Sequence, residues 1–292
     1  MLPAADAALP EQLPVCPEHP ERPSLATCER CGRFLCEACA VTREPPRCAD
    51  CHARVGDPLG ILSQPFSVGS AFANGWTLFR RALPGILPIA LLFGVPGGLL
   101  GHAVKESAGW RSVSWTSLFE ATVGLLAMGA NFALMVGIAE GSRVSVRQAL
   151  RQGLSSWREL FGVNLIQGVQ ILLYSLLFLI PGIIKAVNFA LCLPAAFREP
   201  GHDALKTSAT LVNGRRWEVF GMLVGCYGIA TVPGFAAGFV FGLVSYMAPS
   251  TAPVMAIFTN AGSRLGHAFI AAVSLAAFYG FKHQHGEPLE PR

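Results

Sequence analysis

Charged residues are scarce in this chain. Only 14% of its 292 residues are charged and 52% are hydrophobic, whereas about 25% of the residues of an average soluble domain are charged. This shortage argues against a soluble core for most of the chain and indicates a membrane protein. Residues 1–13 lack both the basic and the apolar segment of a secretory signal, so we expect a flexible tail there.

Groups that would support catalysis or proton transport are also missing. No acidic residue lies near the centre of a long apolar segment, which argues against a proton-coupled transporter. His102 and His267 stand alone, and the pair His202-Asp203 has no metal-ligand spacing and no nucleophile beside it. We therefore interpret these residues as packing or loop residues and expect the protein not to be an enzyme.

Cysteine, in contrast, is concentrated near the N-terminus, where seven of the nine cysteines lie. With one histidine they form four pairs, each with two residues between its members: Cys16 and His19, Cys28 and Cys31, Cys36 and Cys39, and Cys48 and Cys51. His52 is an alternative to the last ligand. A structural zinc ion takes four such ligands in a tetrahedron. The eight side chains thus predict two closed, structural Zn²⁺ sites.

The spacing between the pairs is symmetric, with eight, four and eight residues. This favours an interleaved cross-brace in which the first pair joins the third and the second joins the fourth. Gly32 to Leu35 are predicted to form a tight hairpin, with Phe34 and Leu35 filling a minimal core. A segment of about 40 residues needs such a metal staple to fold. The competing interpretation is a disulfide framework, which requires an oxidising compartment.

The run from Cys16 to His52, with Cys31-Gly32-Arg33-Phe34-Leu35-Cys36 at its centre, resembles a B-box-type zinc finger. That family usually closes its second site with histidines, whereas this chain has Cys48 and Cys51. The resemblance implies a zinc-binding domain, residues 14–54, that binds a protein partner. These residues contain six arginines and six acids, and metal-bound thiolates make the total negative, so nucleic-acid binding is not expected.

Long uncharged segments follow a predicted linker at residues 55–66. They cover 82–101, 121–139, 160–197, 219–263, which is broken at Pro249 to Pro253, and 265–281, with Lys185 as their one charge. About 20 apolar residues cross a membrane, and 160–197 is long enough for two spans that turn at Pro181-Gly182.

The expected fold is an all-α polytopic membrane domain, 67–285, with about six transmembrane helices plus interfacial amphipathic helices, followed by a tail, 286–292. We expect a kink at Pro233-Gly234 and close helix packing at Gly94 and Gly98.

Lysine and arginine are concentrated in alternate connections: Arg80, Arg81, Arg143, Arg147, Arg151, Arg158, Arg198, Lys206, Arg215, Arg216 and Lys282. The opposite connections contain Lys105 and Arg111, with Lys185 and Arg264 at boundaries, where we expect them to extend to the interface. The positive-inside rule therefore predicts cytoplasmic N- and C-termini in the cell (inner) membrane. The cysteines would then lie in reducing surroundings.

One basic segment recurs. Ser67-Val68, Ala71, Gly75 and Phe79-Arg80 match Ser145-Val146, Ala149, Gly153 and Trp157-Arg158, and a fainter copy spans 210–218. We interpret each as an amphipathic helix on the inner membrane face. This pattern, with Leu179 to Ile184 and Ala204 to Phe220, resembles the membrane domain of some bacterial glycerophosphodiester phosphodiesterases over residues 65–285. The phosphodiesterase domain itself is missing from the sequence, so that activity is not implied.

Two functions are weighed. The preferred one is a zinc-binding protein embedded in the lipid bilayer, whose finger binds a cytoplasmic protein. The alternative is a small-solute or lipid transporter with a regulatory finger. Asn164, Gln167 and Gln170 share a helix face, and with Asn131, Lys185 and Asn188 in neighbouring spans they would line its polar path. These amides would otherwise form hydrogen bonds between helices.

Overall fold

The computed structural model of the protein describes residues 14–29, 31–43, 46–49, 51, 57–108 and 119–286. The chain forms two compact units, Met1–Leu59 and Gly60–Arg292. The predicted tail 1–13, His52, Arg111 and residues 287–292 lie outside the described residues, as do parts of the predicted linker and finger.

Three two-stranded antiparallel hairpins make up the described part of the first unit. They pair β1 (Val15–Cys16) with β2 (His19–Pro23), β3 (Ala26–Thr27) with β4 (Phe34–Leu35), and β5 (Ala40–Arg43) with β6 (Pro46–Cys48). Apart from the cysteines, the core of this unit contains little more than Leu35, which is 1% exposed.

The turn predicted at Gly32 to Leu35 is wrong, because Phe34 and Leu35 form a strand and the turn precedes them, where the Cys28 N–H donates to the Arg33 carbonyl. Gly32 lies in that turn with a φ of +71°, a conformation that favours glycine. The predicted burial of Phe34 is also wrong. Successive side chains of a strand point to opposite faces, so Leu35 faces the core while Phe34 is 42% exposed.

The second unit is helical. Its elements are α2 (Val68–Ala108), η1 (Glu120–Gly124), α4 (Leu125–Glu140), α5 (Val146–Leu177), α6 (Leu179–Asn188), α7 (Cys192–Arg198), α8 (Ala204–Val212), α9 (Arg216–Met247), η2 (Pro249–Thr251) and α10 (Ala252–Gln284). Six helical segments among the described residues are long and apolar enough to cross a membrane. They indicate a multi-pass membrane protein.

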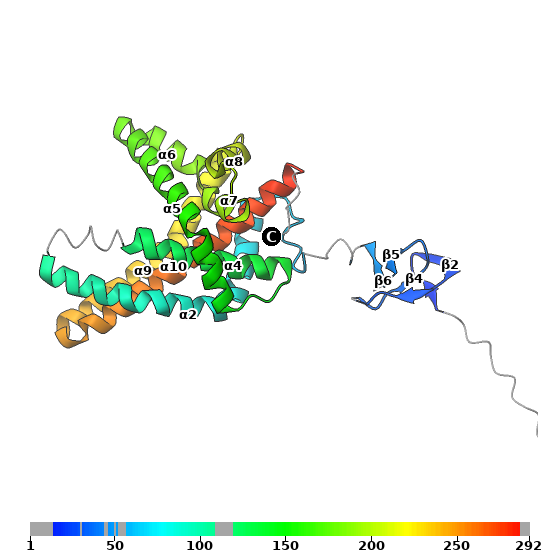
Figure 1. The fold of residues 1–292 in the computed structure, drawn as a ribbon, viewed down its shortest axis with the longest axis horizontal. Helices are drawn as coiled ribbons and strands as arrows, with labels where there is room; N and C mark the ends of the chain where they lie inside the picture. Colours follow the sequence, from blue (N-terminus) through cyan, green and yellow to red (C-terminus); the bar gives the residue numbers. More distant parts are fainter. Residues whose placement is uncertain are drawn as a thin grey trace, which may run out of the picture. The chain divides into compact units, whose positions relative to one another are not determined.

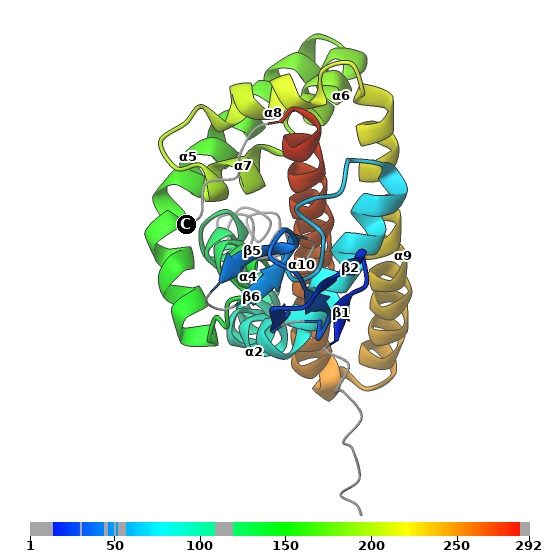
Figure 2. The ribbon, with the colours of Figure 1, turned by 90° about the vertical axis from the view of Figure 1, so that its right-hand side faces the viewer.

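Helix α10 is the central helix of this unit. It runs alongside α2 and α9 (Figures 1 and 2) and also contacts α4, α7 and α8. Glycines bring α2 close to it: a Cβ added at Gly75 would lie 2.7 Å from Val273, and one added at Gly98 would lie 2.6 Å from the Cα atom of Ile257. The close packing predicted at Gly94 is found too, against Ala261.

The first two recurring basic segments begin helices in the same way but do not form separate surface helices, whereas the fainter copy at 210–218 covers the end of α8 and the start of α9. Ser67 and Ser145 each start a helix and bond reciprocally with the residue three positions later, as in a capping box. The helices α2 and α5 then continue without a break into the apolar segments. At a rise of 1.5 Å per residue, α2 is about 60 Å long, so it extends well beyond a hydrocarbon core of about 30 Å.

Two connections differ from the prediction or refine it. The turn between the third and fourth segments is at Phe178, where the backbone is extended (φ −159°), and not at Pro181-Gly182. Pro181 lies in the first turn of α6, where a missing backbone N–H costs nothing. The predicted break near Pro249 is found as η2, and α10 begins before Arg264, so the last apolar segment is long. Pro233-Gly234 does not end α9.

Buried ion pairs join helices near the C-terminal end of α10. Arg198 pairs with Glu140 and Lys282 with Glu199, each at 2.7 Å, and the two cationic side chains are 2% and 7% exposed. Breaking a buried pair leaves an uncompensated charge and is strongly destabilising. Residues that the sequence suggests as solvated loop charges therefore fix α4, α7 and α10 to one another.

Phe66, just before α2, is held by residues of α10 and by Arg215 at the start of α9. Its ring stacks on Phe281 with centroids 4.0 Å apart, and its carbonyl accepts hydrogen bonds from Arg215 and Gln284. A Cβ at Gly280 would lie 2.8 Å from the Cα of Phe66, so glycine permits this approach. The start of α9 and the end of α10 are thus held to the residues just before α2.

The contact at Gly98 can be tested. We expect Gly98→Ala to lower the apparent melting temperature of the detergent-solubilised protein by about 3–8 °C, because overpacking against the α10 backbone costs about 1–3 kcal/mol. Gly168→Ala is the matched control, since a Cβ there meets nothing within 4 Å and alanine favours helix. Equal melting temperatures for the two variants would contradict the α2–α10 packing.

Candidate metal centre

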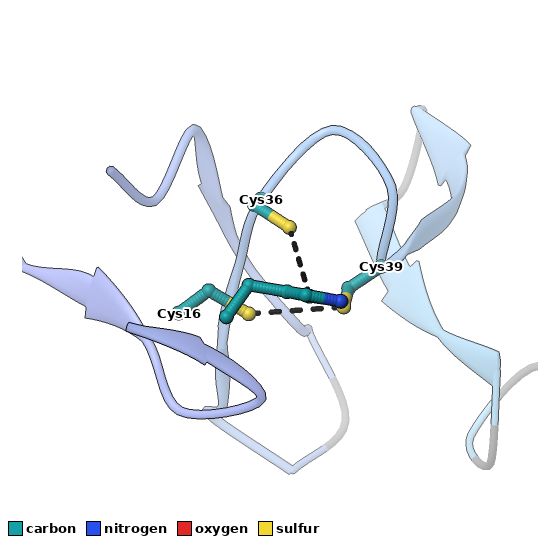
Figure 3. A group of neighbouring side chains, drawn as sticks. Cys16, Cys36 and Cys39 are labelled. Atoms are coloured by element: carbon teal, nitrogen blue, oxygen red, sulfur yellow. Dashed lines mark hydrogen bonds between the residues drawn. The ribbon is translucent and has the colours of Figure 1, made fainter. Parts of the chain in front are cut away.

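The first cluster contains Cys16, His19, Cys36 and Cys39, whose ligand atoms all lie within 4.8 Å of one another. Cys16 ends β1, His19 begins β2, and the two other cysteines follow β4. The Sγ atoms of Cys16 and Cys39 are 3.7 Å apart, and the Nδ1 of His19 lies 3.5 Å from Cys36 Sγ and 3.2 Å from Cys39 Sγ. Figure 3 shows the side chains of Cys36 and Cys39, which lie on one loop, converging with that of Cys16 from another hairpin.

The second cluster contains Cys28, Cys31, Cys48 and Cys51, again within 4.8 Å. The first two flank the turn after β3, and the last two lie at and just after the end of β6. The Sγ atoms of Cys31 and Cys48 are 3.9 Å apart. The first sequence pair thus lies with the third and the second with the fourth, and Cys51 occupies the fourth place in the second cluster.

Short turns make each pair converge. In one of them the Cys39 and Ala40 N–H groups both donate to the Cys36 carbonyl, and in another the Gly32 N–H donates to the Cys28 carbonyl. Such tight turns direct the two side chains of a ligand pair toward the same point. Because the pairs alternate along the chain, each hairpin is tied to a partner that is distant in sequence.

The distances fit metal ligation. Four sulfurs at about 2.3 Å from a tetrahedral ion lie about 3.8 Å from one another, close to the observed 3.7 and 3.9 Å. All nine cysteines are free of disulfides, so the competing disulfide framework is not what the structure shows. Four protein side chains in each cluster could hold a metal ion in a tetrahedral coordination shell.

Three thiols of the clusters have strongly perturbed pKa values. A hydrogen bond from the Cys36 backbone lowers the pKa of the Cys16 thiol to about 6. Burial, and then a hydrogen bond with the Cys16 side chain, raises the pKa of Cys39 to about 12. Burial and then the Cys48 side chain raise that of Cys51 to about 12. Crowded thiolates repel one another, and a divalent cation supplies the charge that lets all of them ionise.

A charged pair flanks the first cluster. Arg33 Nη1 donates to Glu18 Oε1 at 2.7 Å, and the other carboxylate oxygen of Glu18 lies 4.0 Å from Cys39 Sγ. Both side chains are substantially exposed, so the pair contributes little to stability.

Comparison with known proteins gives no match: no protein-family model, no curated protein and no solved structure corresponds to this chain.

Three of the six polar residues predicted to line a path through the membrane make contacts between helices, whereas Asn164 and Gln170 make no side-chain hydrogen bond among the described residues. Gln167 accepts a hydrogen bond from the Cys192 thiol at 2.7 Å, and Asn188 accepts one from Arg216 at 3.1 Å. Lys185 lies over the Tyr174 ring, 4.7 Å from its centroid. These contacts favour the packing interpretation of the amides.

The remaining predicted polar positions have varied surroundings. Asn131 is 6% exposed, and its Oδ1 has no hydrogen-bond partner among the described residues. Arg264, expected to extend to the interface, is 6% exposed and lies over the Phe119 ring. Asp203 caps α8 by accepting from the Lys206 N–H, and His102 lies in α2.

Two features were missed by the sequence reasoning. One is the exposed apolar face of the β3–β4 hairpin, where Leu25 is 71% and Phe34 is 42% exposed. Strand alternation could have separated Phe34 from Leu35 once the pairing was known. The other is a cavity between α2, α9 and α10, for which the sequence carries no signal beyond a high aromatic content.

The grouping of the ligands makes a prediction about metal content. After challenge with EDTA, the full chain purified in detergent should retain two ions. Cys16→Ser with Cys36→Ser should leave one ion, because both changes affect one site. Cys16→Ser with Cys28→Ser should leave none, because each site loses a ligand. Elemental mass spectrometry measures the stoichiometry, and retention of one ion by the second double variant would contradict the interleaved grouping.

Proposed function

We propose that this is an inner-membrane protein with cytoplasmic termini, whose N-terminal finger binds two structural Zn²⁺ ions and a cytoplasmic protein partner. The observation that carries the proposal is an exposed apolar face on a module braced by two four-ligand clusters.

Zinc is the ion that the ligands favour. Seven cysteines and one histidine are soft ligands, and tetrahedral sites of this composition suit zinc. Each site would be closed by four protein side chains, which leaves no position for a catalytic water. The proposal therefore assigns the ions a structural role and the protein no enzymatic one.

The partner surface consists of Leu25, Thr27 and Phe34, here called the hairpin face. Thr27 pairs with Phe34 across the hairpin, and Leu25 lies two residues before Thr27 on the same side. All three are exposed, whereas Leu35 on the other side is buried. Exposed leucine and phenylalanine on a rigid hairpin suit burial against another protein. The resemblance to B-box-type fingers supports the same role.

Charge favours a protein over a nucleic acid as the partner. The arginines of the finger are balanced by acids, and in the structure Arg33 and Arg47 pair with Glu18 and Glu29. Zinc-bound thiolates add negative charge. A surface of this kind does not attract phosphates.

The partner surface can be tested with the full chain in membranes. We expect Leu25→Asp with Phe34→Asp to abolish capture of the partner by in-cell cross-linking, while both zinc ions are retained, because neither residue is a ligand or lies in the core. Val15→Asp, also apolar and 51% exposed but in another hairpin, should leave capture unchanged.

The same cross-linking should fail with Cys28→Ser and Cys36→Ser, which remove a ligand from each cluster. If the hairpin-face variant recovers the same proteins as the unaltered chain, the recruitment function has no support.

Orientation gives a separate prediction. Cys192 and Cys226 are each 1% exposed, so the membrane unit should give little background with a membrane-impermeant thiol reagent. The seven thiols of the finger are accounted for by labelling the chain without an introduced cysteine in parallel. Ser250→Cys should react in intact cells, and Ser145→Cys should react only after permeabilisation, because the arginine-rich connections are expected on the inside. The reverse pattern would overturn the proposed topology.

A further inference from the structure

A cavity of about 1000 Å³ lies between α2, α9 and α10, and we refer to it as the α2/α9/α10 groove. Its walls are mainly apolar, and aromatic side chains come from all three helices: Phe72, Trp76, Phe79, Phe235, Phe241 and Phe258. The groove is open, since Phe235 is 81% and Trp76 is 53% exposed. In a multi-pass membrane protein, such a surface faces lipid.

Two hydroxyl groups in the wall are engaged within the protein and so offer little to a polar ligand. Thr231 donates to the Tyr227 carbonyl at 2.6 Å, and Thr259 donates to the Met255 carbonyl at 2.9 Å. Both bonds lie within their own helices. An occupant of this groove therefore gains mainly by burying apolar surface.

The length of the groove suits an acyl chain. On α10 it runs from Phe258 to Ile270, which at 1.5 Å per residue is about 18 Å. Half of a hydrocarbon core is about 15 Å, the depth of one leaflet of acyl chains.

Positive charge lies beside the groove on α2. Arg80 follows Trp76 by one helical turn, on the same stripe, and is adjacent to Phe79. Arg80 and Arg81 are exposed, and within the described part of the chain neither pairs with an acid. Two such cations next to an apolar groove suit a negatively charged headgroup.

We infer that the α2/α9/α10 groove binds one acyl chain of an anionic phospholipid, whose phosphate lies at Arg80 and Arg81. This site is independent of the finger and its partner. It gives the membrane unit a lipid preference that the apolar helices alone do not supply.

Filling the groove tests the inference. Gly234 and Gly262 line it, and a Cβ at either meets nothing within 4 Å, so Gly234→Leu with Gly262→Leu adds bulk without a clash at Cβ. Native mass spectrometry of the delipidated full chain, titrated with phosphatidylglycerol or phosphatidylcholine, should show one tightly bound phosphatidylglycerol. The filled variant should bind either lipid roughly tenfold or more weakly. Gly168→Leu on α5, equally uncrowded, should bind normally.

The headgroup is tested separately. Arg80→Gln with Arg81→Gln should remove the preference for phosphatidylglycerol, a loss of roughly tenfold or more, and leave phosphatidylcholine binding unchanged. Arg147→Gln on α5, also exposed, should keep the preference. The inference is wrong if the filled variant binds phosphatidylglycerol as well as Gly168→Leu does, or if the double arginine variant keeps its selectivity.

A fluorescence measurement avoids reliance on the filled variant folding. In a chain that keeps Trp76 as its only tryptophan, phosphatidylglycerol with brominated acyl chains should quench emission at a low mole fraction in phosphatidylcholine vesicles. In the same chain carrying Arg80→Gln and Arg81→Gln, quenching should rise only in proportion to the mole fraction of the brominated phosphatidylglycerol. Proportional quenching in both proteins would contradict a selective site.

Discussion

Convergence of eight side chains on two positions is the constraint on which the N-terminal unit depends. Its hairpins have between two and five residues per strand, and such short hairpins are not stable alone. Because the ligand pairs alternate, each cluster ties together segments that neither hydrogen bonding nor the small core around Leu35 would hold. Metal bound in both clusters would hold the hairpin face, which includes the exposed Leu25 and Phe34, in the same way.

The membrane unit is organised by different forces. Helix α10 approaches α2 closely where glycines leave room, and buried pairs of Arg198 with Glu140 and of Lys282 with Glu199 hold the helix ends. Along most of its length, helix α9 has neither close glycine contacts nor buried ion pairs, and its apolar side chains are largely exposed. The groove lies where α9 departs from the packing of α2 and α10. The proposed lipid would fill a space that the helices leave open.

Much of this architecture follows from residue patterns. Ligand spacing predicts the grouping of the eight side chains, and uncharged runs predict the six long apolar helices. Whether the clusters hold zinc, and which side of the membrane they face, stay predictions. Sequence patterns did not predict burial where it depends on strand pairing. Phe34 and Leu35 are both apolar, and only the register of β3 with β4 places Phe34 at the surface. The basic segments were expected to lie on the membrane, yet nothing in the first two ends a helix, so α2 and α5 continue through them. Charge alone also could not show that Arg198 and Lys282 are buried.

The central claim is that the finger is held by two closed metal sites with seven sulfur ligands and one nitrogen ligand between them. X-ray absorption at the zinc edge of the full chain in detergent tests this most directly. The account predicts sulfur at about 2.3 Å, with a minor nitrogen contribution at about 2.0 Å, in a ratio of seven to one. A shell dominated by oxygen or nitrogen, or a protein without zinc whose thiols are oxidised to disulfides, would contradict it.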